Sequence, residues 1–319
     1  MAEADVAVAG GPTLTRRERV RAATSQEIIQ TARGLLITEG SAAISLRAIA
    51  REMGMTAPAL YRYFDSHEQL IHHVVADVFT ELSDYVEQAV HAAAGAGATL
   101  PLASGTPARS GSALVEASDV PENGDTAGDD ADGGKTKGGG DIRGGDTQGS
   151  TAEGDAPALA TELGLITACQ AFRRWSVKHP PEFGLIFGTP LPGVDLYHED
   201  PLMECGLRFG GIFLRLYRDL WRIKPFEVPA DDAIDSSLRG QLERYRALLD
   251  TDLPLGALQV FLRCWVSLYG TVTLEVFGHM RFALDDPAPM FELMLTDLAQ
   301  LIGLRYPLPS RLSVINESP

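Results

Sequence analysis

Lysine, cysteine and long apolar runs are all scarce in this chain. Only four of its 27 basic residues are lysine, so arginine carries nearly all of the positive charge. The three cysteines, Cys169, Cys205 and Cys264, are far apart and lie in apolar helical patterns, which favours buried thiols in a reducing compartment. Because no run of 18 uncharged apolar residues occurs, we expect no transmembrane helix and no membrane partner. The polar N-terminus is unlike a secretory signal, so we expect a cytoplasmic protein.

Motifs of common enzymes and metal sites are also missing. The sequence has no HExxH, GxSxG or CxxC pattern, and the adjacent His72 and His73 point to different sides of a helix. The glycine-rich run at 138–145 lacks the GK[ST] ending of a phosphate loop. We therefore expect no enzymatic activity, no cofactor and no metal site.

Charge is distributed unevenly along the chain, whose formal net charge is −16. Residues 16–62 carry eight arginines and four glutamates and are basic, with a local net charge of +4. Residues 95–156 contain 15 glycines, no aromatic residue and eleven acidic against four basic residues. Such a segment cannot bury enough apolar surface to offset its ordering entropy, so we predict a disordered acidic insertion. It is either a tolerated insertion or an acidic flap that competes with phosphates for the basic region.

Two short helices joined by a glycine turn are predicted within the basic region. Ser45 suits the N-cap of the first helix, whose apolar residues follow at helical spacing. Gly54 supplies the left-handed residue that ends it. In the second helix Leu60 and Phe64 are four residues apart and can face a core. This is the helix-turn-helix arrangement, whose second helix enters the major groove of DNA.

Capping boxes predict a further helix on each side of this motif. Thr24 and Glu27 form the first box, so residues 1–23 are expected to be a flexible arm. Ser66 begins the second box, and the apolar spacing after it predicts a long helix to about residue 94. The arginines before Thr24 either reach DNA phosphates or form a solvated tail.

The run LRAIAREMGMTAPALYRYFDSHEQL resembles the signature of the TetR family of transcriptional regulators. The resemblance covers residues 24–85 and implies an all-α fold. It implies a DNA-binding domain at 24–84 with its motif at 45–64, an all-helical C-terminal domain at 157–306 and a tail at 307–319. Such proteins bind palindromic operators on double-stranded DNA as homodimers and respond to a small-molecule effector. A repressor is expected more often than an activator.

The resemblance also implies roles for individual residues. Arg47 corresponds to a position that reaches a base edge or a phosphate, and short side chains in the first turn of the second helix lie closest to the bases. His67 stands where family members commonly have lysine, so the helix amides would have to hold that phosphate. The implied DNA-contacting residues are Ser45, Arg47, Thr56, Ala57, Pro58, Ala59, Tyr61, Arg62, Tyr63 and His67.

Tyr61 and Tyr63 have an alternative interpretation as ordinary packing residues. We favour DNA contact for both, because Leu60 and Phe64 already occupy the inward positions. For Arg33 and Arg51 we expect a solvated face or a phosphate contact without sequence information.

The C-terminal part is predicted to be helical throughout. The predicted helices span residues 157–179, 181–188, 201–223, 231–250, 255–279 and 287–304. The helix at 255–279 is apolar nearly all round, which is typical of a helix buried on most sides. Together with 287–304 it is the expected dimer face, with two helices from each subunit forming a four-helix bundle.

The effector site is predicted from aromatic residues on these helices, although each of them is alternatively a plain core residue. The candidates are Phe172, Trp175, Phe213, Tyr217, Trp265 and Tyr269, with Arg263 as a polar group. Arg263 and Glu275 interrupt the apolar helix and either orient a ligand or form ion pairs within or across the dimer. The alternative function is that of a ligand-independent architectural or partner-binding DNA protein.

Overall fold

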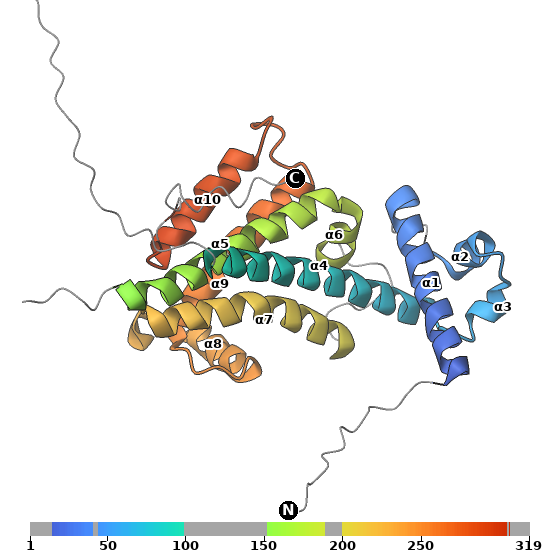
Figure 1. The fold of residues 1–319 in the computed structure, drawn as a ribbon, viewed down its shortest axis with the longest axis horizontal. Coiled ribbons are helices and arrows are strands. Elements are labelled where there is room, and N and C mark those ends of the chain that lie inside the picture. Colours follow the sequence, from blue (N-terminus) through green and yellow to red (C-terminus); the bar gives the residue numbers. More distant parts are fainter. Residues whose placement is uncertain (1–14, 41–43, 99–151, 189–199, 305, 307–319) are drawn as a thin grey trace, which may run out of the picture.

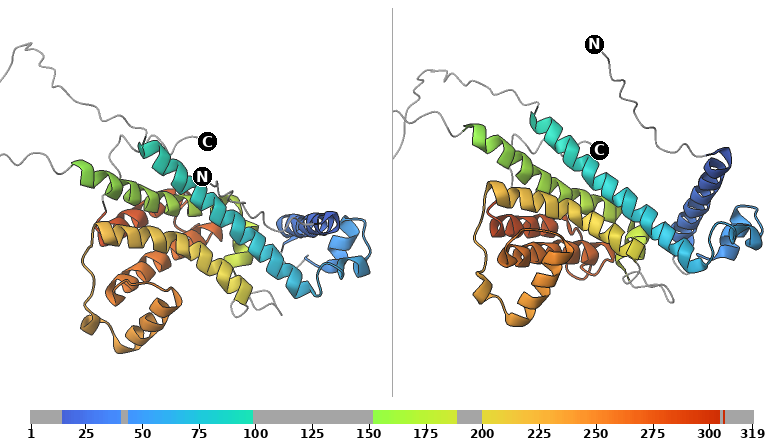
Figure 2. Two further views of the ribbon diagram at one scale, coloured as in Figure 1. Left: turned by 60° about the horizontal axis from the view of Figure 1, so that its bottom comes forward. Right: turned by 90° about the horizontal axis from the view of Figure 1, so that it is seen from below.

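The computed structural model describes residues 15–40, 44–98, 152–188, 200–304 and 306, and every regular element within these ranges is helical. The predicted all-α fold is therefore confirmed. A small head of three helices stands at one end of the long helix α4, and a larger bundle packs against the rest of α4 (Figures 1 and 2). In chain order the helices are α1 (Arg16–Glu39), α2 (Leu46–Glu52), α3 (Ala57–Leu60), α4 (His67–Ala98), α5 (Ala152–Lys178), α6 (Pro180–Phe187), α7 (Asp200–Ile223), α8 (Ser236–Leu248), α9 (Leu255–Val276) and α10 (Ala288–Leu301).

Helix α1 begins at Arg16, so the predicted start at Thr24 is wrong. Its capping box is formed by Thr15 and Glu18: the Glu18 N–H donates to Thr15 Oγ1 at 3.3 Å, and the Thr15 N–H donates to Glu18 Oε2 at 2.7 Å. The predicted flexible arm is consequently helical over residues 16–23, while its first 14 residues lie outside the described part. Buried side chains begin only at Ile28, so apolar periodicity gave no sign of these first turns.

The core of the head is formed where α1, α2 and α3 meet the start of α4. Ile28, Ile49, Leu60 and Leu70 from the four helices are all fully buried. Helix α4 starts with Ser66 as a cap, because the Gln69 N–H donates to Ser66 Oγ at 3.0 Å. The Gln69 side chain accepts from the Asp65 N–H at 2.6 Å instead of from Ser66, so the predicted capping box is shifted by one residue.

Helix α4 connects the head to the C-terminal bundle, where it packs along α5 and α7 (Figure 1). It continues to Ala98, and α5 begins at Ala152, so both ends of the predicted insertion at 95–156 are helical. Residues 99–151, the body of that insertion, lie outside the described residues. Both ends of this segment contain alanine, which has the highest helix propensity, so they are helical although the composition of the whole segment indicates a loop.

The remaining helices agree with prediction to within a few residues, except at 231–250. A 3-10 turn at Asp231–Ala233 comes first, and α8 then starts after Asp235, whose carboxylate accepts from the Ser237 N–H at 2.9 Å. Helix α9 is long and apolar enough to cross a membrane, and 44% of its most apolar window is buried. Core helices of bundles have the same properties, and α9 packs against α5, α6, α8 and α10. The predicted tail at 307–319 lies outside the described residues.

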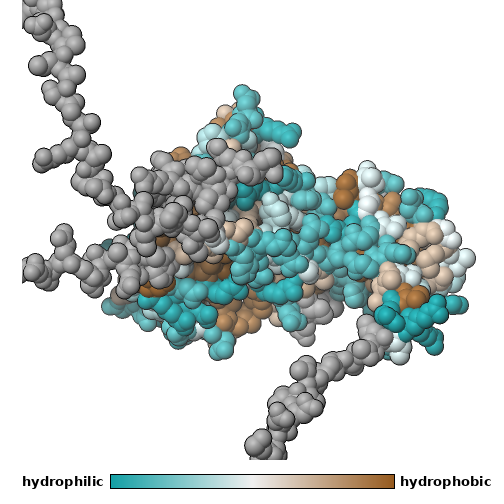
Figure 3. All heavy atoms as spheres, viewed as in Figure 1, coloured by the Kyte–Doolittle hydropathy of each residue, from teal (hydrophilic) through white to brown (hydrophobic). Residues whose placement is uncertain are grey.

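The surface seen in Figure 3 is largely hydrophilic over the described residues, with hydrophobic side chains gathered in separate patches. Singly exposed apolar side chains are normal in a folded protein, whereas contiguous apolar patches mark interaction surfaces.

Candidate DNA-binding surface and ligand cavity

The predicted turn of the motif is present between α2 and α3. Ser45 is the N-cap of α2, since its Oγ accepts from the Ala48 N–H at 3.2 Å. Gly54 has a φ of 64°, in the left-handed region where a glycine is favoured. Thr56 occupies the N-cap position of α3, but its side chain forms no capping hydrogen bond. The Thr56 hydroxyl is thus not engaged by its own helix.

Helix α3 is shorter than predicted, because it ends at Leu60 and a tight turn leads on to Phe64. Leu60 and Phe64 are 0% and 2% exposed, which confirms them as the inward pair. Tyr61 is 52% exposed. Tyr63 is half-buried and packs against the core of the head, so the inward positions are not limited to the predicted pair.

Most of the implied DNA-contacting side chains are at the surface of the head. The exposed ones are Ser45, Arg47, Thr56, Pro58, Tyr61, Arg62 and His67. The half-buried ones are Ala57, Ala59 and Tyr63. They lie on α2, α3, the adjoining turns and the first turn of α4, at the end of the molecule remote from the bundle (Figure 1). The structure brings them together on one unit, and their contact with DNA stays a prediction.

His67 has a structural partner within the head. Its Nε2 lies 2.6 Å from the backbone oxygen of Ile44. A carbonyl oxygen only accepts, so Nε2 carries the proton in this bond and Nδ1 faces away from it. The bond ties the start of α4 to the segment that precedes α2. His67 therefore positions the motif, and its Nε2–H is not available for a phosphate.

Arg21 is a residue that the sequence did not single out, and it reaches the end of the recognition helix from α1. Its Nη2 donates to the backbone oxygen of Arg62 at 2.7 Å. Its guanidinium carbon lies 5.6 Å from the centre of the Tyr63 ring, within the range of a cation–π contact. The arginine-rich composition before Thr24 was the available signal, but the contact spans 41 residues of sequence.

Arg33 is buried, so the expected solvated face or phosphate contact is wrong. Its Nη1 lies 2.9 Å from Asp77 Oδ2, and its Nη2 lies 2.7 Å from Glu81 Oε2, both on α4. The same Nη2 is 3.6 Å from Glu182 Oε1 on α6. The guanidinium has five N–H donors, so it can donate to several carboxylates at once. We call these four residues the ionic joint, because they connect α1 of the head to two helices of the bundle.

A chain of aromatic contacts leads from the ionic joint into the bundle. Trp175 Nε1 donates to Glu81 Oε1 at 3.0 Å. Phe183, next to the joint on α6, lies 6.2 Å from Phe172, whose ring lies 6.1 Å from Trp265 at an interplanar angle of 26°. Both distances are measured between ring centres and lie within the usual range for packed aromatic pairs. The joint and the centre of the bundle are therefore parts of one packed interior.

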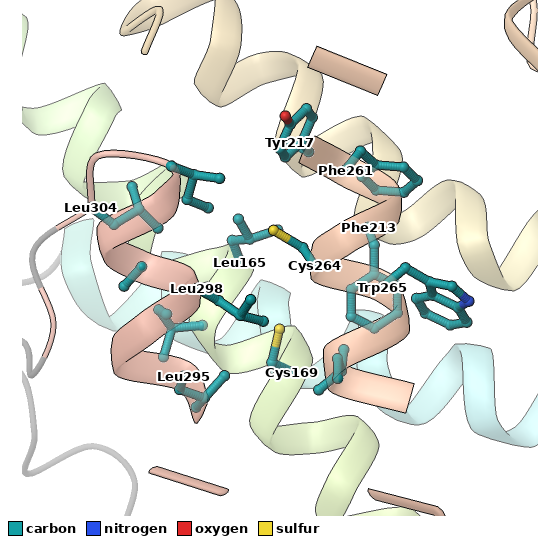
Figure 4. A pocket seen from close by; sticks show the side chains of 14 residues that line it. Leu165, Cys169, Phe213, Tyr217, Phe261, Cys264, Trp265, Leu295, Leu298 and Leu304 are labelled. Carbon is teal, nitrogen blue, oxygen red and sulfur yellow. The ribbon is translucent and has the colours of Figure 1, made fainter. Parts of the chain in front are cut away.

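A small cavity lies inside the bundle between α5, α7, α9 and α10 (Figure 4). Its volume is about 50 Å³. Its walls are apolar side chains, two cysteines and one tyrosine, namely Leu165, Ile166, Cys169, Phe213, Tyr217, Phe261, Cys264, Trp265, Leu268, Leu295, Leu298, Ala299, Ile302 and Leu304.

The polar atoms in this wall are neutral or already engaged. The Tyr217 hydroxyl donates to the backbone oxygen of Ala257 at 2.8 Å, and burial raises its pKa. Burial also raises the pKa of the Cys169 and Cys264 thiols to about 12, so both are protonated at neutral pH. The cavity consequently offers dispersion contacts and no charge.

The predicted effector residues divide into two groups. Those that line the cavity are Phe213, Tyr217 and Trp265, and those that do not are Phe172, Trp175, Tyr269 and Arg263. Phe172 and Trp175 are 0% and 1% exposed and fill the core beside the cavity. The Tyr269 hydroxyl donates to the backbone oxygen of Phe187 at 2.9 Å, while Arg263 is exposed on the outer side of α9.

Glu275, the other polar interruption of α9, forms an ion pair within the chain. Its carboxylate accepts from Arg173 Nε at 2.7 Å and from Arg173 Nη2 at 2.6 Å. This two-point geometry is the strongest form of an arginine–carboxylate pair. Glu275 thus holds α9 to α5 and does not face the cavity.

Family models match both parts of this architecture. The model described as "Bacterial regulatory proteins, tetR family" matches residues 28–74, which include the whole motif. The model described as "Tetracyclin repressor-like, C-terminal domain" matches residues 165–298. The chain belongs to the TetR family of bacterial transcriptional regulators. The resemblance found in the motif is thereby confirmed, and the second model shows that the C-terminal domain is of the same family.

Relatives of this TetR-family regulator cover nearly its whole length. The HTH-type transcriptional regulators Rv1816 of Mycobacterium tuberculosis and Mb1846 of Mycobacterium bovis are each 24% identical to it over 283 residues. Each alignment covers 87% of this chain and 91% of the relative. A crystal structure of the "putative regulatory protein SCO4313" is 26% identical, with a TM-score of 0.56, and the match covers 90% of this chain and all of that one.

Membership of the family defines the general function of the head. TetR-family regulators bind DNA through this helix-turn-helix and control transcription. The exposed motif, its basic surroundings and the packing of the head on α4 agree with that activity. This TetR-family protein is therefore a DNA-binding transcriptional regulator.

Proposed function

We propose that this TetR-family regulator is a cytoplasmic homodimeric repressor, which binds a palindromic operator and leaves it when a small apolar effector enters the bundle. The observation that carries the proposal is that one continuous helix, α4, joins an exposed basic motif to a bundle with an apolar cavity. Residues 24–84, extended by the start of α1, are the DNA-binding domain in this proposal, and 157–306 form the effector and dimerisation domain.

The proposed dimer face is the outer side of α9 and α10. Val266 on α9 and Phe277 directly after its end are 65% and 40% exposed, and Met290 and Leu293 on α10 are 46% and 55% exposed. Helical spacing places each pair on one stripe of its helix, and the two helices pack side by side. A second copy covering these stripes would form a four-helix bundle and remove large apolar side chains from water.

Arg47→Ala and Tyr61→Ala are each expected to weaken operator binding while leaving thermal stability nearly unchanged. Both side chains are exposed on the head, so their removal leaves no cavity. Loss of a good base contact costs about 1–3 kcal/mol, which is roughly 5- to 150-fold in Kd. Fluorescence anisotropy on an operator selected in vitro measures the affinity, and thermal melts measure stability. A large drop in Tm would show that these residues belong to the core.

The effector is expected to be small, uncharged and apolar. Ligand pockets of about 300–1,000 Å³ hold drug-sized molecules, whereas this cavity is only about 50 Å³. A larger ligand therefore has to spread the helices that form the walls. Two of those helices, α5 and α7, pack along α4, so spreading them displaces the helix that carries the head. DNA affinity and effector affinity are then linked reciprocally.

Toluene at millimolar concentration is expected to raise Tm and to weaken operator binding, because it is apolar enough for this cavity. Benzoate is the matched control, since it has the same ring and one charge that the cavity cannot solvate. Ala299→Val adds two methyl groups to a wall residue that is 1% exposed, and this variant should lose the response to toluene. Equal effects of toluene on the unmodified chain and on Ala299→Val would place the binding site elsewhere.

The ionic joint provides a route from the bundle to the head. Effector-induced movement of α6 or α4 would change the distances from Glu182, Asp77 and Glu81 to Arg33 and thereby reorient α1. Proximity alone does not demonstrate coupling, which requires that both sites bias one structural element. Trp175→Phe removes the indole hydrogen bond to Glu81 and keeps an aromatic ring, so it tests the route with little loss of packing.

A ligand-independent architectural or partner-binding DNA protein is the second candidate, and the small volume of the cavity favours it. In that case the bundle would only dimerise, and no compound would affect DNA binding. A compound that shifts both Tm and operator affinity supports the repressor. A broad screen of apolar compounds in which neither quantity moves supports the alternative.

A further inference from the structure

The first two turns of α1 extend past the core of the head. Buried side chains of α1 start at Ile28, and all residues from Arg16 to Ala23 are exposed. The segment holds four arginines and one glutamate, so its net charge is +3 in a chain of net charge −16. Since helices without a packed apolar face are marginal in water, this extension is not explained by burial.

Arg21 fixes the extension to the recognition helix. Its hydrogen bond to the Arg62 oxygen at 2.7 Å and its position over the Tyr63 ring hold α1 against the turn that follows α3. Arg62 and Tyr61 in the same turn are exposed. The face of α1 that carries Arg21 is therefore the face that adjoins the DNA-contacting surface.

Helical geometry places the other arginines relative to this face. Arg17 precedes Arg21 by four residues, so it lies about 40° around the helix and about 6 Å further along it. Arg19 lies about 160° away from Arg21, on the opposite side of the helix. Of these two exposed arginines, Arg17 shares the DNA-proximal face and Arg19 does not.

We propose that Arg17 contacts the phosphate backbone of duplex DNA just outside the bases read by the recognition helix. The helical extension thus acts as a second binding element. Such a contact adds affinity that depends on salt and carries no sequence information. The inference rests on DNA binding by the head, and it concerns the length of DNA that each subunit covers.

The test uses the full chain and an operator selected in vitro from random duplexes, either with flanks of ten base pairs or trimmed to the selected sequence. Arg17→Ala is expected to weaken binding to the long duplex about tenfold at low salt. Because a dimer carries two copies, the slope of log Kd against log salt should fall by about two units. Arg19→Ala, the matched control on the opposite face, should leave both values unchanged, and Arg17→Lys should retain most of the affinity.

Two further comparisons complete the test. Binding to scrambled duplexes measures sequence preference, and binding to the trimmed duplex measures the contribution of the flanks. Arg17→Ala should weaken operator and scrambled long duplexes by the same factor, and its effect should vanish on the trimmed duplex. Alanine favours helix, so α1 is preserved, which circular dichroism checks. Equal effects of Arg17→Ala and Arg19→Ala, or an equal loss on both duplex lengths, would overturn the inference. Failure of the unmodified chain to select any duplex would instead count against the proposed operator-binding function.

Discussion

Arg33→Ala is expected to lower the free energy of unfolding by about 3–5 kcal/mol, the usual cost of removing one partner of a buried ion pair. The Arg33 side chain is 11% exposed, and its three carboxylate partners on α4 and α6 include Glu182, which is 3% exposed. Without the guanidinium, Glu182 is left with an unpaired charge away from water. The loss should appear in urea unfolding curves as a lower midpoint at an unchanged slope.

Two further variants distinguish the loss of the buried ion pair from the effect of removing any arginine. Arg51→Ala removes an exposed arginine of α2 and should change stability by less than about 0.5 kcal/mol. Adding Glu182→Gln to Arg33→Ala removes the stranded charge and should restore part of the stability. If Arg33→Ala and Arg51→Ala give the same unfolding curves, the ionic joint does not hold the head to the bundle.

The joint also has a functional consequence. Because Arg33 connects α1 to α6, weakening it should loosen the head relative to the bundle as well as lower stability. We expect Arg33→Ala to bind the operator more weakly and to respond less to any effector, since a movement of α4 or α6 is no longer transmitted to α1 through this ion pair. Measuring operator affinity with and without an effector under conditions where the variant is folded tests this consequence.

The double variant Val266→Asp, Leu293→Asp is expected to be monomeric and to bind the operator about 10²- to 10⁴-fold more weakly. The two side chains are 65% and 55% exposed on neighbouring helices, and a dimer would bury both. A carboxylate in that position would have to be desolvated without a partner. Two linked heads bind a two-part operator far more tightly than one head does, so loss of the dimer removes most of the affinity. Sedimentation velocity measures the assembly, and anisotropy measures binding.

Ile223→Asp is the matched control, because Ile223 is 44% exposed at the end of α7, outside the proposed dimer face. It should leave both assembly and operator affinity unchanged. Should the double variant fail to fold, the Tm of the unmodified chain decides the matter, since a dimer shows a Tm that rises with protein concentration. A concentration-independent Tm together with a monomeric sedimentation coefficient would exclude the dimer.

The helix-turn-helix could be predicted from sequence because its signals are local. Ser45 as a cap, Gly54 in the left-handed region and the inward pair Leu60 and Phe64 are each determined by residues within a few positions. The start of α1 is not predicted correctly, because no buried apolar stripe follows its cap at Thr15 until Ile28. Apolar periodicity therefore favours the later cap at Thr24.

The ionic joint and the cavity could not be predicted, because both depend on contacts between distant segments. Arg33 meets Asp77 across 44 residues, and nothing near Arg33 in the sequence distinguishes it from a surface arginine. Likewise, Phe172 and Phe213 are both aromatic residues on apolar helix faces, yet one fills the core and the other lines the cavity. That difference arises from how four helices pack, which composition and periodicity do not determine.

Two identical heads that read one operator would leave a defined pattern in a hydroxyl-radical footprint of the full chain on duplex DNA that it has selected from a random pool. We predict two inverted half-sites, protected equally, with centres about 10–10.5 base pairs or a multiple of that distance apart. A single asymmetric protected site with no inverted partner in the selected sequences would contradict this prediction.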